Sequence, residues 1–295
     1  MNDIKQDNLI FKIFPSFTHP YIALMRLDRP IGFLLLFYPI SFSLVSQSNY
    51  DYELLKYFIL FFIGSVVMRS AGCVINDILD KKIDKKVKRT QSRPLASSKL
   101  TILKACVTLV ILLLIGLLIL INLNMPSIIL GFLIIPLVIL YPLAKRFFAL
   151  PQLILAMTYN WGCMIGWVAI SSPYNFNNIF ILYLSLVIWT IVYDTIYAVQ
   201  DEEEDIKMNL YSTAVLFGSK KLLILNSLII IQYFLLIVFG YKMDYGIVFY
   251  VIVALISLLN LRDINFLWKN EVQKSGLYFK RNNYYGFLIL LSIIV

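Results

Sequence analysis

Long apolar runs separated by short polar segments make up most of the chain. These runs predict helices at about 30–47, 54–76, two within 105–144, two within 147–193, 222–241, 246–261 and 277–295. Turn-like segments at 122–127 and 171–178 divide the two longer stretches. A helix needs about 20 apolar residues to cross a bilayer. We therefore expect an all-α polytopic membrane protein, a bundle of nine transmembrane helices that forms a single domain over residues 1–295.

The basic residues are concentrated on alternate connections between these helices. The N-terminal segment and every second connection carry 23 of the 26 Lys and Arg, whereas the other connections carry only Lys56 and Lys242. Cytoplasmic loops are enriched in Lys and Arg, so we expect a cytoplasmic N-terminus. The net charge of +9 would suggest nucleic acid in a soluble protein. Here the charge follows membrane topology, and we expect no nucleic-acid partner.

The rarer residue types exclude several kinds of site. His19 is the one histidine in the sequence, which excludes sites that need two histidine ligands. The three cysteines are far apart and lie in apolar segments, so we expect core positions for Cys73, Cys106 and Cys163. The first apolar run lacks the features of a cleaved secretory signal, and we expect it to remain as a helix.

A first acidic cluster lies at the end of the second predicted helix. Asn76, Asp80 and Asp84 follow one another at intervals of four residues, so a continuing helix would place them along one face. Asp77 lies beside that face. Mg²⁺ binds oxygen ligands, typically one or two carboxylates together with substrate phosphates.

A second cluster, with the sequence DEEED, lies at the end of the sixth predicted helix. Asp201 and Asp205 repeat the four-residue spacing, Tyr197 is one turn before Asp201, and Asp194 lies deeper in the membrane. Either cluster alone could be a solvated helix end that neutralises nearby lysines. Two clusters at the same membrane boundary favour a site in which Mg²⁺ bridges carboxylates and a diphosphate.

Basic side chains at the same boundary are candidates for binding the anionic substrate. A guanidinium group suits bidentate phosphate binding, and the candidates are Arg26, Arg89, Arg93 and Lys145. The alternative is that these residues only set the topology. Arg69 lies within a helix on the face of Asn76 and Asp80, which suggests a functional interior position. Its alternative role is a structural ion pair, for example with Asp194.

The clusters and their flanking residues resemble the UbiA superfamily of intramembrane prenyltransferases. The first motif is Asn76-Asp77-x-x-Asp80-x-x-x-Asp84 followed by Arg89, Thr90, Arg93, Pro94 and Leu95, and the second is Asp194-x-x-Tyr197-x-x-x-Asp201-x-x-x-Asp205 followed by Ser212-Thr213-Ala214. Segments at 26–32, 68–73, 141–146, 150–152 and 282–284 are most similar to the branch that prenylates 4-hydroxybenzoate.

The resemblance implies a nine-helix bundle with a central cavity and a cytoplasmic cap over Mg²⁺. It implies metal ligands at Asn76, Asp80, Asp84, Asp201 and Asp205. The candidate catalytic residues are Asp77, Asp194, Tyr197 and Asp201. The substrate-binding candidates are Arg26, Arg69, Arg89, Arg93 and Lys145. The acidic motifs are 124 residues apart, which suggests pseudo-repeat halves at about 20–146 and 147–262.

The activity implied is Mg²⁺-dependent transfer of a polyprenyl group from polyprenyl diphosphate to 4-hydroxybenzoate in ubiquinone biosynthesis, in a bacterial inner membrane. The alternatives are another aromatic acceptor (dihydroxynaphthoate, homogentisate or haem) and, more distantly, a secondary transporter. The carboxylates cluster at helix ends and not at the midplane, which favours the enzyme.

The sequence departs from the family pattern in three places. Ser97-Ser98 stands where Ser-Gly is usual, Glu202 to Glu204 are more acidic than the usual residues, and 208–211 lacks the usual Gly and Lys.

Overall fold

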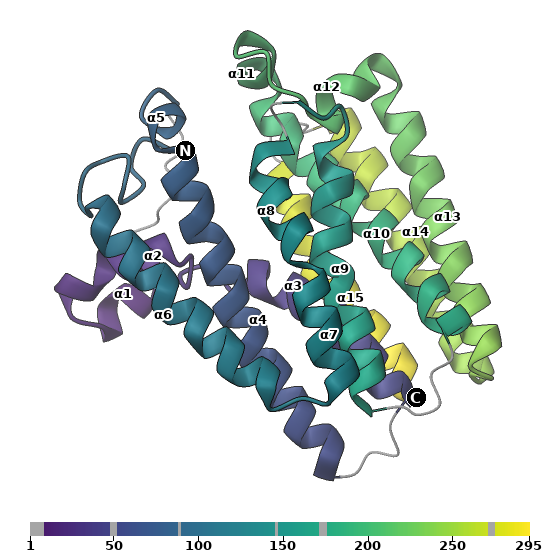
Figure 1. Cartoon of the computed structure of the whole chain (residues 1–295). Helices are drawn as coiled ribbons and strands as arrows, with labels where there is room; N and C mark the ends of the chain where they lie inside the picture. The colour runs from purple at the N-terminus through teal and green to yellow at the C-terminus, as the bar shows by residue number, and fades with distance from the viewer. Residues whose placement is uncertain (1–8, 48–51, 88–89, 145–146, 171–175, 271–274) are drawn as a thin grey trace. The chain divides into compact units, whose positions relative to one another are not determined.

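The structure is a computed structural model that describes residues 9–47, 52–87, 90–144, 147–170, 176–270 and 275–295. These residues form helices and connecting turns, with no strand among them (Figure 1). The helices are α1 (Leu9–Ile13), α2 (His19–Leu24), α3 (Ile31–Gln47), α4 (Tyr52–Leu79), α5 (Lys81–Asp84), α6 (Ile102–Ile121), α7 (Met125–Leu133), α8 (Ile135–Ala144), α9 (Pro151–Ile170), α10 (Phe176–Ala198), α11 (Glu202–Lys207), α12 (Thr213–Phe217), α13 (Lys221–Lys242), α14 (Ile247–Asn270) and α15 (Ser275–Ile294). Short 3₁₀ turns are η1 (Ser16–Thr18), η2 (Val199–Asp201) and η3 (Gly218–Lys220).

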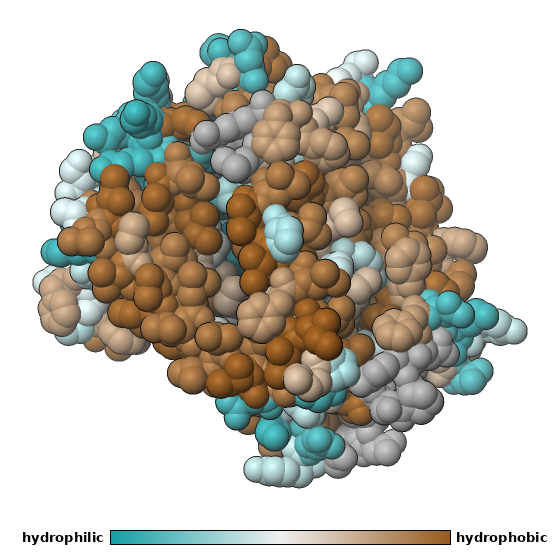
Figure 2. Space-filling model, in the orientation of Figure 1, coloured by the Kyte–Doolittle hydropathy of each residue, from teal (hydrophilic) through white to brown (hydrophobic). Residues whose placement is uncertain are grey.

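Within the described residues, seven helical segments are long and apolar enough to cross a membrane. They are Tyr52–Leu79, Ile102–Ile121, Met125–Pro142, Pro151–Ile170, Phe176–Lys207, Thr213–Lys242 and Ile247–Trp268. Hydrophobic side chains cover most of the face in Figure 2, as expected for a surface in contact with lipid. The predicted class, an all-helical multi-pass membrane protein, is confirmed. The count of nine crossings and the cytoplasmic cap stay predictions.

The observed helices follow the predicted ones closely, and local sequence explains their ends. Asn124 caps α7 by accepting a hydrogen bond from the Ser127 amide at 3.1 Å, which accounts for the predicted turn at 122–127. The predicted end of the eighth helix at 261 was wrong, because α14 continues to Asn270. Its polar Asp263 accepts hydrogen bonds from Tyr285 and Arg281 of α15 at 2.6 and 2.7 Å, so the helix can continue past an acidic residue.

The chain divides into two compact units, which we describe separately. The first comprises residues 1–34 and 60–123. Its core joins α2, α4, α6 and the segment after α5, through buried side chains that include Leu24, Val74, Leu95 and Leu112. This unit contains the whole of the first acidic cluster, and its packing sets the position of α2 relative to the end of α4.

The second unit comprises residues 35–59 and 124–295. In this unit α10 packs against α9, α13 and α15. Its largest fully buried side chains include Trp167, Trp189, Phe239 and Tyr278. This unit contains the second acidic cluster, at the end of its central helix α10.

Candidate active site

The first acidic cluster begins where α4 ends. The helix is interrupted at Asp80, whose φ and ψ of −94° and 8° lie in the bridge region, and α5 starts at the next residue. The prediction of one continuous helix through Asp84 was therefore wrong. Asn76, Asp80 and Asp84 are still one helical turn apart across the break. The Asp80 amide donates to the Asn76 carbonyl at 2.9 Å, and the Asp84 amide donates to the Asp80 carbonyl at 2.8 Å.

Two arginines hold the carboxylates of this cluster. Asp77 is only 1% exposed, and its Oδ1 accepts from Nη2 of Arg26 at 2.8 Å and from Nη1 of Arg93 at 3.4 Å. The same Nη1 donates to Oδ1 and Oδ2 of buried Asp84 at 3.2 and 3.0 Å. Arg26, Asp77, Arg93 and Asp84 thus form one network, which we call the arginine–aspartate network.

Arg26 occupies a left-handed backbone conformation in the turn after α2, with φ of 57°. A non-glycine residue pays about 1–2 kcal/mol for this conformation. The guanidinium Nη1 also donates to the Ala23 carbonyl at 2.6 Å, and the Arg29 amide closes the turn on the Arg26 carbonyl at 3.0 Å. In the same turn, burial raises the pKa of the Asp28 carboxyl above its ordinary value, although Arg29 at 3.2 Å opposes the shift. The turn fixes Arg26 toward Asp77.

Arg69 lies in α4, on the side where α3 begins. A Cβ atom added to Gly32 would lie 2.9 Å from the Arg69 Nε, so glycine at this position makes room for the guanidinium. Arg69 and Asp194 belong to different units. The predicted ion pair between them stays a prediction.

The second acidic cluster repeats the backbone break of the first. After α10 the chain passes through η2, and Asp201 has φ and ψ of −106° and 3° before α11 begins. Neither Asp80 nor Asp201 uses its side chain to cap the short helix that follows it. Asp194, Asp201 and Asp205 are half-buried. Each cluster therefore places an aspartate at the break between a membrane helix and a short helix.

Residues of α13 and α15 contact the second cluster and its neighbours. Glu202 is ion-paired with Lys221, so one of the three additional acidic residues is held by a lysine. The Tyr197 ring lies 4.9 Å from the Phe279 ring, centroid to centroid, with an interplanar angle of 45°. Tyr197 is thus positioned by α15 one turn before Asp201.

Comparison with known proteins identifies the family. Residues 34–287 match the UbiA prenyltransferase family. The chain belongs to this family.

Curated relatives align over nearly the whole chain. It is 39% identical over 295 residues to "4-hydroxybenzoate polyprenyltransferase, mitochondrial" of Drosophila pseudoobscura pseudoobscura, covering 99% of this chain and 73% of that protein. It is 37% identical over 275 residues to the 4-hydroxybenzoate octaprenyltransferase of Haemophilus ducreyi, covering 93% of this chain and 98% of that protein.

Solved structures share the UbiA fold. A UbiA homologue from Aeropyrum pernix K1 has a TM-score of 0.74 at 24% identity, covering 89% of this chain and 96% of that chain. A UbiA homologue from Archaeoglobus fulgidus, bound to GPP and Mg²⁺, has a TM-score of 0.68 at 19% identity, covering 92% of this chain and 99% of that chain.

The donor chemistry of this UbiA-family chain fits Mg²⁺. Within the described residues, no three His, Cys, Asp or Glu side chains group closely enough to hold a metal by themselves. Mg²⁺ needs only one or two carboxylates when substrate phosphates complete its coordination. Asp80 and Asp84 provide two carboxylates in the first cluster, and Asp201 and Asp205 provide two in the second. The buried Oδ2 of Asp77 has no hydrogen-bond partner among the described residues. The Asp84 carboxylate already accepts a hydrogen bond from Arg93.

The structure also explains a family motif to which the sequence assigned no role. The Thr213 amide donates to Gln152 Oε1 at 2.9 Å, and the Thr213 and Thr195 hydroxyls lie 2.6 Å apart. These buried contacts tie the segment after the second cluster to α9 and α10. In the sequence, the polar Gln152 at the start of an apolar helix could have indicated a buried hydrogen bond. The sequence did not indicate that its partner is Thr213.

Two of the three departures from the family pattern coincide with unusual backbone. Ser98, which replaces a usual glycine, has φ of 61°, and Asn209 in the segment 208–211 has φ of 53°. Asparagine tolerates this left-handed region better than most residues, whereas serine is strained there. Two predicted substrate-binding residues, Arg89 and Lys145, lie outside the described residues.

Proposed function

We propose that this protein transfers a polyprenyl group from polyprenyl diphosphate to the ring carbon ortho to the hydroxyl of 4-hydroxybenzoate, as a step in ubiquinone biosynthesis. Membership of the UbiA family and the names of relatives that align over nearly the whole chain support the reaction and the acceptor. The geometric observation that carries the proposal is the matched backbone break at Asp80 and Asp201, which places an aspartate at the end of a membrane helix in each cluster.

The metal in this proposal is Mg²⁺ held with the diphosphate. Asn76, Asp80 and Asp84 would contribute ligands from the first cluster, and Asp201 and Asp205 from the second. When bound, Mg²⁺ supplies the positive charge that makes diphosphate a better leaving group. The Mg²⁺ of the Archaeoglobus homologue supports this choice.

The basic residues would bind and orient the two anionic substrates. In this role Arg26 and Arg93 would share their donors between the carboxylates they now contact and the incoming phosphates, and Asp77 would hold both guanidinium groups in place. The remaining proposed contacts to diphosphate or to the aromatic acid come from Arg69, Arg89 and Lys145.

The reaction then needs a polarised phenol and a dry cavity. The allylic C–O bond breaks with its electron pair going to diphosphate, and the ring carbon forms the new C–C bond. The ring proton leaves to a carboxylate of the second cluster or to diphosphate. Asp194 or Asp201 would accept the phenol hydrogen bond, Tyr197 would contact the reacting groups, and the surrounding membrane helices would exclude water.

We place the active site on the cytoplasmic side of a nine-helix bundle, under a cap, in a bacterial inner membrane. The asymmetric distribution of Lys and Arg supports this orientation. The matched breaks at Asp80 and Asp201 support pseudo-repeat halves at about 20–146 and 147–262.

The test is an assay in membranes with labelled 4-hydroxybenzoate and polyprenyl diphosphate, with and without Mg²⁺. We expect Asp80→Asn and Asp201→Asn each to lower Mg²⁺-dependent turnover by at least about 100-fold, because loss of a group that only supports a metal ligand already costs about 10–100-fold. The matched control is Glu53→Gln, an exposed acid at the other end of α4, which should stay within about twofold of the wild type. A wild type that forms no Mg²⁺-dependent lipid product from 4-hydroxybenzoate refutes the proposal.

A further inference from the structure

We propose that the N-terminal segment Leu9–Met25 binds an anionic phospholipid, whose phosphate enters a basic cavity beside α2. The segment comprises α1, η1 and α2, all in the first unit. Three features carry the inference: exposed apolar side chains, a cavity lined by two lysines, and an apolar groove on the opposite face of α2.

The apolar side chains of this segment face away from the core. Leu9, Ile13 and Phe17 are 72%, 71% and 75% exposed, and Phe14 is 49% exposed. Local contacts hold the turn in this shape, because His19 Nε2 donates to the Phe14 carbonyl at 2.8 Å and the Thr18 hydroxyl donates to the Pro15 carbonyl at 2.7 Å. Apolar side chains gathered next to Lys12 are typical of a segment that lies in the membrane interface.

The cavity lies on one face of α2 and has a volume of about 470 Å³. Its polar lining comes from Lys12, Ser16, His19 and Lys99, and its apolar walls include Phe11 and Pro94. No acidic side chain is among its lining residues. Two ammonium groups and a hydroxyl match the charge and hydrogen-bonding needs of a phosphate.

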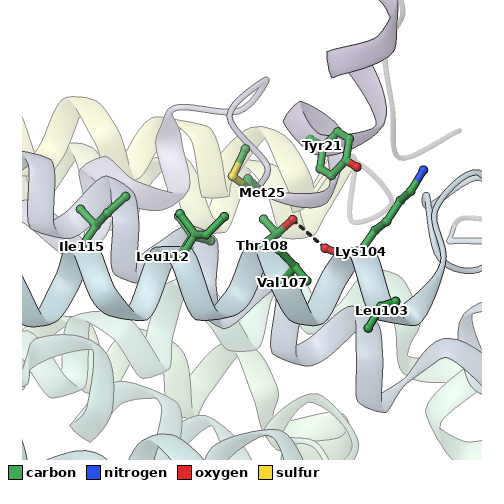
Figure 3. Close-up of a pocket in the computed structure, with 9 residues that line it drawn as sticks. Tyr21, Met25, Leu103, Lys104, Val107, Thr108, Leu112 and Ile115 are labelled. Carbon is green, nitrogen blue, oxygen red and sulfur yellow. Dashed lines mark hydrogen bonds between the residues drawn. The ribbon is translucent and has the colours of Figure 1, made fainter.

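The opposite face of α2 borders a groove of about 590 Å³ that runs along α6. Figure 3 shows Tyr21 and Met25 above it, with Leu112 and Ile115 along α6 and Lys104 toward one end. Only 17% of the membrane-crossing window of α6 is buried, so this helix faces lipid. The short helix α2 therefore lies between an apolar groove and a basic cavity. This arrangement matches the membrane interface, where acyl chains meet charged headgroups.

These observations select a phospholipid over a free phosphate ion. A free ion would contact Lys12 and Lys99 but would make no contact with the exposed apolar side chains of Leu9, Ile13 and Phe17 beside them. A phospholipid contacts both the lysines and the apolar side chains. Its phosphate enters the cavity, while its acyl region covers the apolar side chains next to Lys12.

The first experiment measures lipid binding to the full-length protein, purified in detergent, by native mass spectrometry. We expect phosphatidylglycerol to bind about tenfold more tightly than phosphatidylcholine at one site. Lys12→Gln with Lys99→Gln should remove this preference. The control pair Lys220→Gln with Lys280→Gln, which removes the same charge from exposed lysines of the second unit, should keep it.

The inference is overturned if the Lys12 and Lys99 variant, melting at the wild-type temperature, retains the preference. It is equally overturned if inorganic phosphate displaces phosphatidylglycerol at equal concentration, since the site would then hold a free anion. A second measurement tests the apolar side chains. In vesicles of phosphatidylglycerol brominated on the acyl chains, Phe17→Trp fluorescence above the wild-type background should be quenched, and unquenched fluorescence contradicts lipid contact.

Discussion

The arginine–aspartate network allows a quantitative test of how the first cluster is held. In the network, Asp77 is 1% exposed and the Arg26 side chain 12% exposed, so their 2.8 Å ion pair is almost fully removed from water. Removing one partner of a buried pair costs about 3–5 kcal/mol, because the other charge is left uncompensated. We therefore expect Asp77→Asn to lower the free energy of unfolding by about 3 kcal/mol, at the lower end of this range because Arg93 keeps its pair with Asp84.

Arg26→Gln should cost less than Asp77→Asn. Arg93 still donates to Asp77 at 3.4 Å in that variant, so the carboxylate keeps one positive partner. The loss is then one charged hydrogen bond, about 2 kcal/mol. In the double variant the two losses overlap, and we expect a coupling energy of about 1–2 kcal/mol between the sites.

The assay is reversible unfolding in mixed detergent–SDS micelles, followed by circular dichroism, for the wild type, both single variants and the double variant. Arg262→Gln is the matched control, because Arg262 is 69% exposed in its pair with Asp263 and should contribute less than about 1 kcal/mol. Additive effects of Asp77→Asn and Arg26→Gln, within about 0.5 kcal/mol, would refute a network that acts as one unit.

Three further substitutions test single features of the site by the same unfolding assay. Gly32→Ala places a Cβ 2.9 Å from the Arg69 Nε, but the flexible arginine side chain can shift, so the cost should be about 1 kcal/mol; Gly72→Ala, with no atom within 4 Å, should be neutral or stabilising. Ser98→Gly relieves a φ of 61° and should stabilise the protein by about 1 kcal/mol, whereas Ser97→Gly should destabilise it by about 0.5 kcal/mol; equal effects would contradict strain at Ser98. Gln152→Leu leaves the buried Thr213 amide without its acceptor and should cost about 1–3 kcal/mol. An unchanged midpoint for Gln152→Leu would contradict that role.

Apolar run length was enough to predict most of the helices. Lipid-exposed helices such as α6 and α13 need only apolar residues, and their observed ends lie within a few residues of the predicted ones. The partners of the polar residues in α15 could not be predicted. Asn282 accepts from Trp189 at 2.8 Å and Asn283 from Tyr38 at 3.0 Å. Such pairs join residues far apart in sequence, and no local pattern reveals them.

The sequence predicted which residues belong to the candidate site but not which of them contact one another. Residue type and spacing indicated the acidic clusters and the nearby arginines. They did not indicate that Arg93 binds Asp77 and Asp84, because that contact depends on how the segment after α5 folds back. The break at Asp80 was also missed, since four-residue spacing is the same in a continuous helix and in two helices joined at a bridge-region residue.

The two backbone breaks have a consequence for the order in which ligands bind. A helix carries about half a negative charge at its C-terminus, and α4 and α10 both end beside their own aspartates. Arg26 and Arg93 offset this charge at the first cluster, and Lys221 offsets part of it at the second. At either cluster, a diphosphate that arrives alone meets a helix end of its own sign. We therefore expect the cation to bind first, or together with the diphosphate as one neutralised pair, and free diphosphate to bind weakly.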